Sequence, residues 1–275
     1  MLARSLFRRE APWTVYFELA KLGYRRFASY RGATFAGIFT NTIFGFMLAY
    51  VTLALFSARG SINGYDGSDA VTYMWIGQGM LMTTYIISPS RMSEIAQRIR
   101  SGDIATDLQR PLDFQLYWLA QDLGRGTYHA IFRGVPPFVL GALVFSLRLP
   151  TSPLVWLAFV ASVILAVLVS FGMRFLVNLT AAWVLDYRGF ASIAGFTWPF
   201  LAGNYIPLAA LPDWAYHLAI LLPTACLIQT PAAVFLGKPD TGQALLLQLG
   251  WAVALLGLGR VVLRRAERRL VVQGG

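Results

Sequence analysis

Polar residues at helical spacing are the first candidates for chemistry in this chain. The set consists of Gln121, Arg125, His129 and Arg133. Because they recur every four residues, a helix would align them in one slowly drifting stripe. Asp122 lies three residues before Arg125, close enough for the two side chains to pair. Such a stripe suits a polar lining or a contact with a partner chain, or it is simply solvated where a helix leaves the membrane.

The sequence lacks the motifs of common enzyme classes. It has no GxxxxGK[ST] phosphate loop, no HExxH zinc motif and no GxSxG nucleophile elbow. Two histidines, His129 and His217, are too few and too far apart to propose a metal site. The single cysteine, Cys226, excludes an internal disulfide. We therefore expect neither catalysis nor a bound metal or cofactor.

A polar segment at 91–113, RMSEIAQRIRSGDIATDLQRPLD, is the second candidate. The spacing of Met92, Ile95 and Ile99 predicts a short amphipathic helix. Glu94 and Arg98 stand at i and i+4, the favourable orientation for a helical ion pair. Such a segment is either a solvated connector or a docking element that transmits force from a soluble partner.

Long uncharged stretches must position these residues, and they place the chain in a membrane. Residues 149–173 carry no charge, and a helix of that length, at about 1.5 Å per residue, outspans a hydrocarbon core of roughly 30 Å. Continuous apolar runs satisfy their backbone in lipid as helices. With 275 residues, 57% hydrophobic and 13% charged, the chain fits a single transmembrane domain over 1–275.

Charge distribution predicts an all-α polytopic membrane protein with six transmembrane helices and both termini in the cytoplasm. Residues 12–30 alternate aromatic and basic side chains, which predicts an amphipathic helix in the cytoplasmic interface. Prolines interrupt 206–238, so we expect a re-entrant outer hairpin of two short helices between spans five and six. The net charge of +10 follows this positive-inside pattern and does not indicate nucleic-acid binding. The expected spans cover 32–58, 70–90, 114–147, 149–173, 189–212 and 241–259.

Aromatic residues near the span ends most simply form an interfacial belt. A minority are candidates to line a path for an amphipathic or aromatic substrate, and these are Phe44, Phe46, Tyr73, Trp198 and Tyr205. Arg125, His129 and Arg133 are candidates for the same path or for an interface with a second membrane chain.

The segment IRSGDIATDLQRPLDFQLYWLAQDLGR resembles the cytoplasmic loop and third span of ABC transporter permeases of the type-two exporter class, which have the type V exporter fold. The family pattern has an isoleucine, G-D-I, a leucine, R-P-L-D and an aromatic entry to the span. The matching residues are Ile99, Gly102, Asp103, Ile104, Leu108, Arg110, Pro111, Leu112, Asp113 and Tyr117. The interfacial helix, six spans and broken outer hairpin extend the resemblance over most of the chain.

This resemblance implies the membrane subunit of an ATP-driven exporter, with ATP and magnesium bound by two separate ATPase subunits. Residues 94–104 would couple to them, with Ile95 and Ile99 as apolar anchors and Glu94, Arg98, Arg100, Gly102, Asp103 and Ile104 completing the contact. A second permease, identical or related, would complete a path for a hydrophobic, amphipathic or cationic substrate through a bacterial inner membrane. The alternatives are an exporter of polysaccharide or lipid-linked glycan, an ion-coupled secondary transporter and a membrane scaffold.

Overall fold

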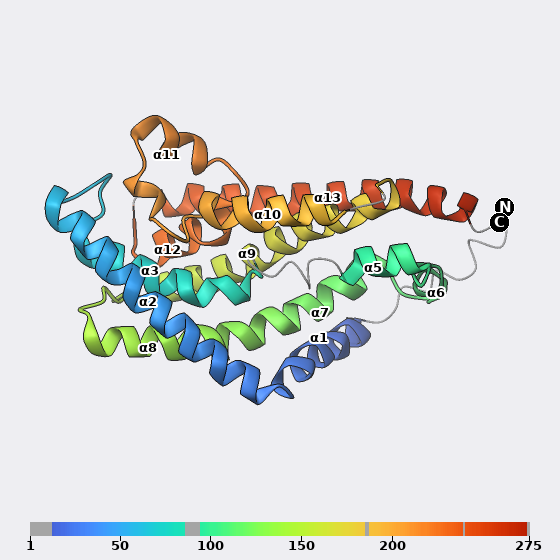
Figure 1. Ribbon diagram of the computed structural model, residues 1–275, viewed down its shortest axis with the longest axis horizontal. Coiled ribbons are helices and arrows are strands. Elements are labelled where there is room, and N and C mark those ends of the chain that lie inside the picture. The colour runs from blue at the N-terminus through green and yellow to red at the C-terminus, as the bar shows by residue number, and fades with distance from the viewer. Residues whose placement is uncertain (1–12, 86–93, 185–186, 239, 274–275) are drawn as a thin grey trace.

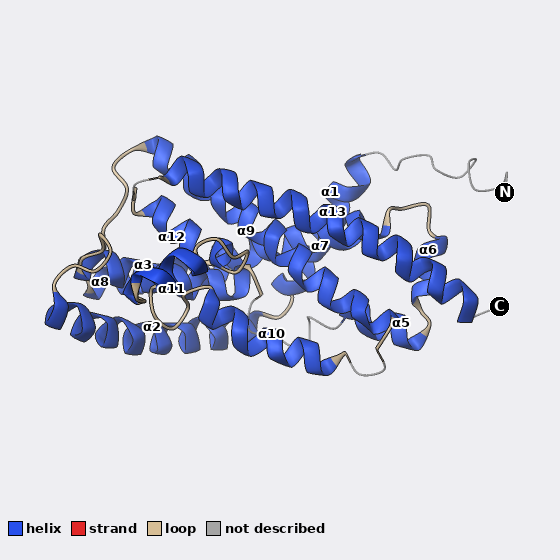
Figure 2. Cartoon of the chain, turned by 90° about the horizontal axis from the view of Figure 1, so that it is seen from above, coloured by secondary structure: helices blue, strands red, loops and turns tan. Residues whose placement is uncertain are grey.

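The computed structural model describes residues 13–85, 94–184, 187–238 and 240–273, and the regular elements in these ranges are helices. Most of them run along one long axis (Figures 1 and 2). Three are long and apolar enough to cross a membrane: α2 (Arg31–Arg59), α9 (Pro153–Leu179) and α13 (Thr241–Gln273). The expectation of an all-helical fold is therefore confirmed, and three of these helices are candidate membrane spans.

The remaining helices are shorter or interrupted. They are α1 (Trp13–Ala28), α3 (Gly67–Thr83), α5 (Glu94–Ser101), α6 (Ile104–Gln109), α7 (Phe114–His129), α8 (Val135–Val144), α10 (Arg188–Leu201), α11 (Asp213–Ala219) and α12 (Gln229–Phe235). Short 3-10 turns are η2 (Thr180–Ala182), η3 (Leu208–Ala210) and η4 (Ala225–Leu227). The helices predicted in 12–30 and 91–113 are present, the latter as α5 and α6, while Met92 lies outside the described residues.

The third predicted span begins at Phe114, as expected, because the side chain of Asp113 caps α7 by accepting a hydrogen bond from the backbone N–H of Leu116 at 2.8 Å. The same carboxylate pairs with Arg260 of α13. The span is broken by a π-helical turn, η1 (Ala130–Gly134), before α8. Pro136 and Pro137 explain the break, since neither can donate a backbone hydrogen bond and their rings crowd the preceding turn.

Most residues of helix α3 are buried. It packs against α2, α7, η1, α8 and α12. The indole of Trp75 on α3 packs against a glycine on each of two neighbouring helices, Gly45 of α2 and Gly141 of α8. A Cβ at these glycines would lie only 2.6 and 2.3 Å from the indole, so neither position has room for a side chain. The predicted second span is therefore the core of the bundle.

Helix α1 packs directly on α7 (Figures 1 and 2). Two glycines bring the backbones into contact, since a Cβ at Gly23 would lie 2.2 Å from the carbonyl oxygen of Gln121, and one at Gly124 would lie 1.8 Å from that of Ala20. Trp13, Phe17 and Leu22 remain exposed on α1. The helix is thus joined to the bundle along one face.

Candidate functional site

A buried ion cluster joins α7 to α9. Asp122 accepts from Arg125 Nε at 2.7 Å and from Arg174 Nη2 at 2.6 Å, and all three side chains are at most 9% exposed. We call Asp122, Arg125 and Arg174 the helix cluster. The predicted pair of Asp122 and Arg125 is confirmed. Arg174 follows the uncharged stretch 149–173 but is still helical, because α9 continues to Leu179, and it is buried.

The helix cluster also closes one end of α3. Arg125 Nη1 and Nη2 donate to the backbone carbonyls of Met82 and Thr83 at 2.6 and 3.0 Å. The hydroxyl of Ser170 on α9 donates to the carbonyl of Thr84. The last carbonyls of a helix have no partner within it and carry partial negative charge, so a cation is well suited to this position.

Tyr85 follows α3 in an unusual conformation. It is buried and has a φ of +60°, which non-glycine residues rarely adopt. The guanidinium carbon of Arg125 lies 4.2 Å from the centre of its ring and that of Arg174 lies 5.7 Å away. His129 is buried between Tyr85 and Phe27, at ring-centre distances of 6.0 and 4.9 Å. Thus Arg125 and His129 of the predicted stripe both face the residue at which the chain leaves α3.

The α5–α6 segment (residues 94–109) has ion pairs that differ from the predicted one. Glu94 accepts from Arg26 Nη1 of α1 at 3.2 Å, whereas Arg98 Nη2 donates to Asp107 Oδ1 of α6 at 2.9 Å. The predicted pair of Glu94 with Arg98 is therefore wrong, because each has a partner on another helix. Hydrogen bonding to Asp107 raises the pKa of Arg98.

The apolar face of the α5–α6 segment is buried in this chain. Ile95 and Ile99 are 6% and 5% exposed and belong to one cluster with Ile104, Phe175 and Leu179. Ile95 and Ile99, the predicted apolar anchors, thus pack against α9 within this chain. Their part in coupling to an ATPase stays a prediction. The exposed residues of the segment are Gln97, Arg100, Ser101, Gly102, Asp103, Ala105, Thr106 and Gln109.

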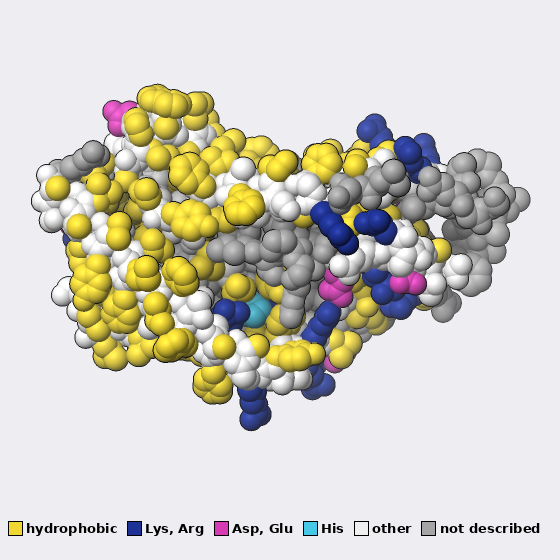
Figure 3. Space-filling model, viewed as in Figure 1, with side chains coloured by type: hydrophobic (Ala, Val, Ile, Leu, Met, Phe, Trp, Pro, Cys, Tyr) yellow, Lys and Arg dark blue, Asp and Glu magenta, His cyan; other side chains and the backbone are white. Residues whose placement is uncertain are grey.

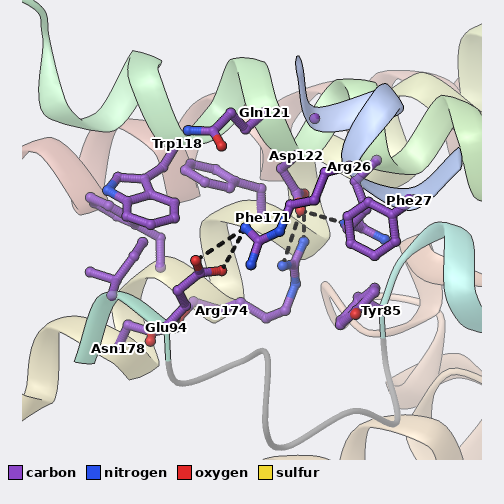
Figure 4. A pocket seen from close by; sticks show the side chains of 14 residues that line it. Arg26, Phe27, Tyr85, Glu94, Trp118, Gln121, Asp122, Phe171, Arg174 and Asn178 are labelled. Carbon is purple, nitrogen blue, oxygen red and sulfur yellow. Dashed lines mark hydrogen bonds and ion pairs between the residues drawn. The ribbon is translucent and has the colours of Figure 1, made fainter. Parts of the chain in front are cut away.

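A cavity of about 70 Å³ connects the α5–α6 segment with the helix cluster (Figure 4). Its walls come from α1, α5, α7 and α9, and include the pair of Arg26 and Glu94 as well as Asp122, Arg125 and Arg174. In Figure 4, Arg26, Glu94, Asp122 and Arg174 surround the same space. The arrangement links charges on four helices but contains no pair of groups placed for nucleophilic or metal chemistry.

The candidate path residues differ in burial. Tyr73 is fully buried, and its hydroxyl donates to the carbonyl of Ala202 at 3.4 Å. Trp198 is half-buried, whereas Phe44 and Tyr205 are exposed. Phe46 packs on Trp75 at a ring-centre distance of 5.1 Å. That the exposed members line a path between two chains stays a prediction.

A second ion cluster lies at the opposite end of α3, where three loops meet. Arg148 Nη1 pairs with Asp69 Oδ1 at 2.9 Å and its Nη2 with Asp66 Oδ2 at 2.8 Å. Lys238 pairs with Asp69 and donates to the carbonyl of Gly64 at 2.6 Å. We call Asp66, Asp69, Arg148 and Lys238 the loop cluster.

Asp66 also caps the start of α3. Its side chain accepts from the backbone N–H of Asp69 at 2.8 Å, and the Asp69 side chain accepts in return from the N–H of Asp66. Partial burial raises the pKa of Asp66, but the hydrogen bond from Asp69 and the charge of Arg148 outweigh it and hold that pKa below its usual value. No local pattern indicates the loop cluster, because its basic residues lie far along the chain from its acids.

Comparison with known proteins gives one result for this chain. A family model described as ABC-2 family transporter protein matches residues 39–274. This match includes α3, the α5–α6 segment and both ion clusters. A search of curated proteins finds no match.

Proposed function

The chain belongs to the ABC-2 family of transporter proteins, and from this premise we propose that it is the permease subunit of an ATP-driven exporter. Permeases of this family are membrane subunits that work with ABC ATPase partners. ATP and magnesium would bind to two such ATPase subunits, and this chain would supply the path through the membrane. The α5–α6 segment carries the proposal, because it combines an exposed polar face with a direct connection to the bundle.

The exposed face of the α5–α6 segment is the proposed ATPase contact. Arg100 and Asp103 are exposed there with the turn at Gly102, whose φ of +82° suits glycine. Glu94 and Arg98 would act within the chain, where Glu94 joins α5 to α1 and Arg98 joins α5 to α6. Ile95, Ile99 and Ile104 would transmit a displacement to α9 because they are packed against it.

The ion pairs suggest how such a displacement reaches the core. A movement of α5 alters the cavity that contains the helix cluster, and Arg125 holds the end of α3. ATP binding would shift the permease between two states only if those states differ in such contacts. The helix cluster is a suitable place for this difference, since its three charges are shared by α7 and α9.

The proposed membrane arrangement has six spans. In addition to α2, α9 and α13, it uses α3, the combined α7–η1–α8 and α10 as spans. α1 would lie at the cytoplasmic interface, and α11 with α12 would enter the bilayer from the outer side. Both termini would be in the cytoplasm of a bacterial cell, where the basic residues flanking the spans favour this orientation.

A second permease, identical or related, would complete the path with this chain. We propose a hydrophobic, amphipathic or cationic substrate, because the spans offer few polar groups to replace the hydration shell of a strongly polar solute. A polysaccharide or lipid-linked glycan is the second candidate within the same family.

Co-purification tests the proposal. The tagged chain, expressed in its native membrane and extracted in mild detergent, should retain an ATPase that mass spectrometry identifies. Arg100→Glu combined with Asp103→Lys should abolish this retention, because both side chains are on the exposed face. Asp213→Lys on exposed α11 is the matched control and should retain the ATPase. Absence of an ATPase from the unaltered chain would contradict the proposal and favour ion-coupled transport.

A further inference from the structure

Arg133 carries a charge that no described carboxylate of this chain neutralises. It lies in the π-helical turn η1, half-buried, and its Nε is buried without a hydrogen-bond partner. Within the described part of the chain no carboxylate lies at ion-pair distance from it, whereas Arg125 and Arg174 share Asp122. A cation at membrane depth is costly and normally marks a partner or a functional site.

The guanidinium is fixed at a defined depth. It packs over Gly37 of α2, where an added Cβ would lie 2.1 Å from Nη2. Gly37 is six residues beyond Arg31, the first residue of α2, so the charge lies about 9 Å along that helix. On the other side of η1, a Cβ at Gly79 would lie 3.1 Å from the Cα of Gly134, which seats the turn on α3. The side chain is therefore held across α2 rather than extended toward the membrane surface.

Several described residues close to Arg133 in the sequence and on α2 are apolar and exposed. Ile131, Phe132 and Val135 beside it, and Phe35 on α2, are exposed. Figure 3 shows basic and histidine side chains next to a part of the surface that is mainly hydrophobic. A ligand at this position would therefore have an anionic group for the guanidinium and apolar chains for the surface around it.

A second copy of this chain has no suitable acid to offer. None of its 13 acidic residues lies in α2, η1, α8, α9 or α10, and Asp122 on α7 is buried in the helix cluster. A phosphate group attached to lipid chains meets both requirements, because arginine forms paired hydrogen bonds with phosphate oxygens. We propose that Arg133 binds the phosphate of a lipid-like molecule, either a resident phospholipid or the transported cargo, between α2 and η1.

This inference rests on the proposed function only for placing α2 and η1 in a membrane. Binding of phosphatidylglycerol by the full chain in detergent, measured by native mass spectrometry, tests it without an ATPase. Arg133→Gln should weaken phosphatidylglycerol binding by about tenfold, as expected for the loss of a charge-assisted pair. The affinity of Arg133→Lys should lie between those of the unaltered chain and Arg133→Gln. Diacylglycerol, which has the same chains and no phosphate, should bind all variants equally.

A pair of glycine substitutions provides a matched test that keeps the charge. Gly37→Ala forces the guanidinium away and should weaken phosphatidylglycerol binding, whereas Gly32→Ala on the same helix meets nothing within 4 Å and should not. Equal binding by the unaltered chain, Arg133→Gln and Gly37→Ala would overturn the proposal. If millimolar inorganic phosphate displaced the lipid, the proposal that the ligand carries lipid chains would be overturned, and the site would bind a free anion instead. If phosphatidylglycerol binds as expected while no ATPase co-purifies, only the proposed function fails.

Discussion

The two ion clusters hold opposite ends of the same helix by different means. At the start of α3 the loop cluster places two carboxylates, and at its end the helix cluster places Arg125 on the last carbonyls. Both arrangements suit the helix dipole, which favours negative charge at the first turn and positive charge at the last. The loop cluster joins connecting segments, whereas the helix cluster joins α7 and α9 themselves.

The two clusters also differ in how far their side chains are exposed to water. In the loop cluster, Arg148 is 50% exposed, although its partner Asp69 is 2% exposed. Water can therefore solvate Arg148 if its ion pair with Asp69 is lost. In the helix cluster one acid serves two buried arginines, and no water-exposed member can compensate for its loss. We infer that the loop cluster holds the start of α3 in place and that the helix cluster is the more sensitive of the two to substitution.

The largest effect should come from Asp122→Asn. This change leaves Arg125 and Arg174 buried without a counter-charge, and breaking a buried pair in this way costs about 3–5 kcal/mol of stability. Thermal unfolding in detergent should show a large fall in Tm. Asp213→Asn, on exposed α11, is the control and should change little. If Asp122→Asn had the same Tm as the control, the claim that the helix cluster is the more sensitive of the two would be contradicted.

An intermediate effect should come from Asp69→Asn in the loop cluster. The buried amide can still accept hydrogen bonds but loses two charged partners, Arg148 and Lys238, for a cost of about 1–3 kcal/mol. The same unfolding measurement should rank it below Asp122→Asn. The reverse order would show that the loop cluster is the more important of the two.

The smallest effect should come from Asp66, and it should depend on pH. Because folding lowers its pKa, Asp66 stabilises the folded protein above its unfolded pKa, about 3.9, and this contribution is lost as pH falls below that value. Exposed pairs such as Asp66 with Arg148 contribute about 0–1 kcal/mol, and salt reduces this further. Unfolding scans between pH 6 and 3 should therefore converge for Asp66→Asn and the unaltered chain at the acid end. Parallel curves would assign the acid sensitivity to other carboxylates.

Local patterns in the sequence were sufficient for part of this structure. Hydropathy identified the long helices, and the three-residue spacing identified Asp122 with Arg125. Spacing failed for Glu94 with Arg98, because Arg26 and Asp107 are partners that only the folded chain brings near. Periodicity also placed Ile95 and Ile99 on one face without revealing that α9 covers it.

Contacts between distant segments account for the rest. Arg174 is 52 residues from Asp122, and the loop cluster joins residues up to 169 positions apart. No local pattern reports such pairs, and the positive φ of Tyr85 has no signal in its residue type. The prediction that Arg100 and Asp103 contact an ATPase remains to be tested.

The contact of α1 with α7 determines which changes the chain tolerates. Any residue larger than glycine at position 23 or 124 would separate two backbones, and no rotamer change relieves a Cβ that meets a carbonyl oxygen. Gly32, Gly189, Gly242, Gly250 and Gly257 meet nothing within 4 Å. In a saturation library selected for correct insertion, Gly23 and Gly124 should therefore be nearly invariant, while the five open glycines accept many residues.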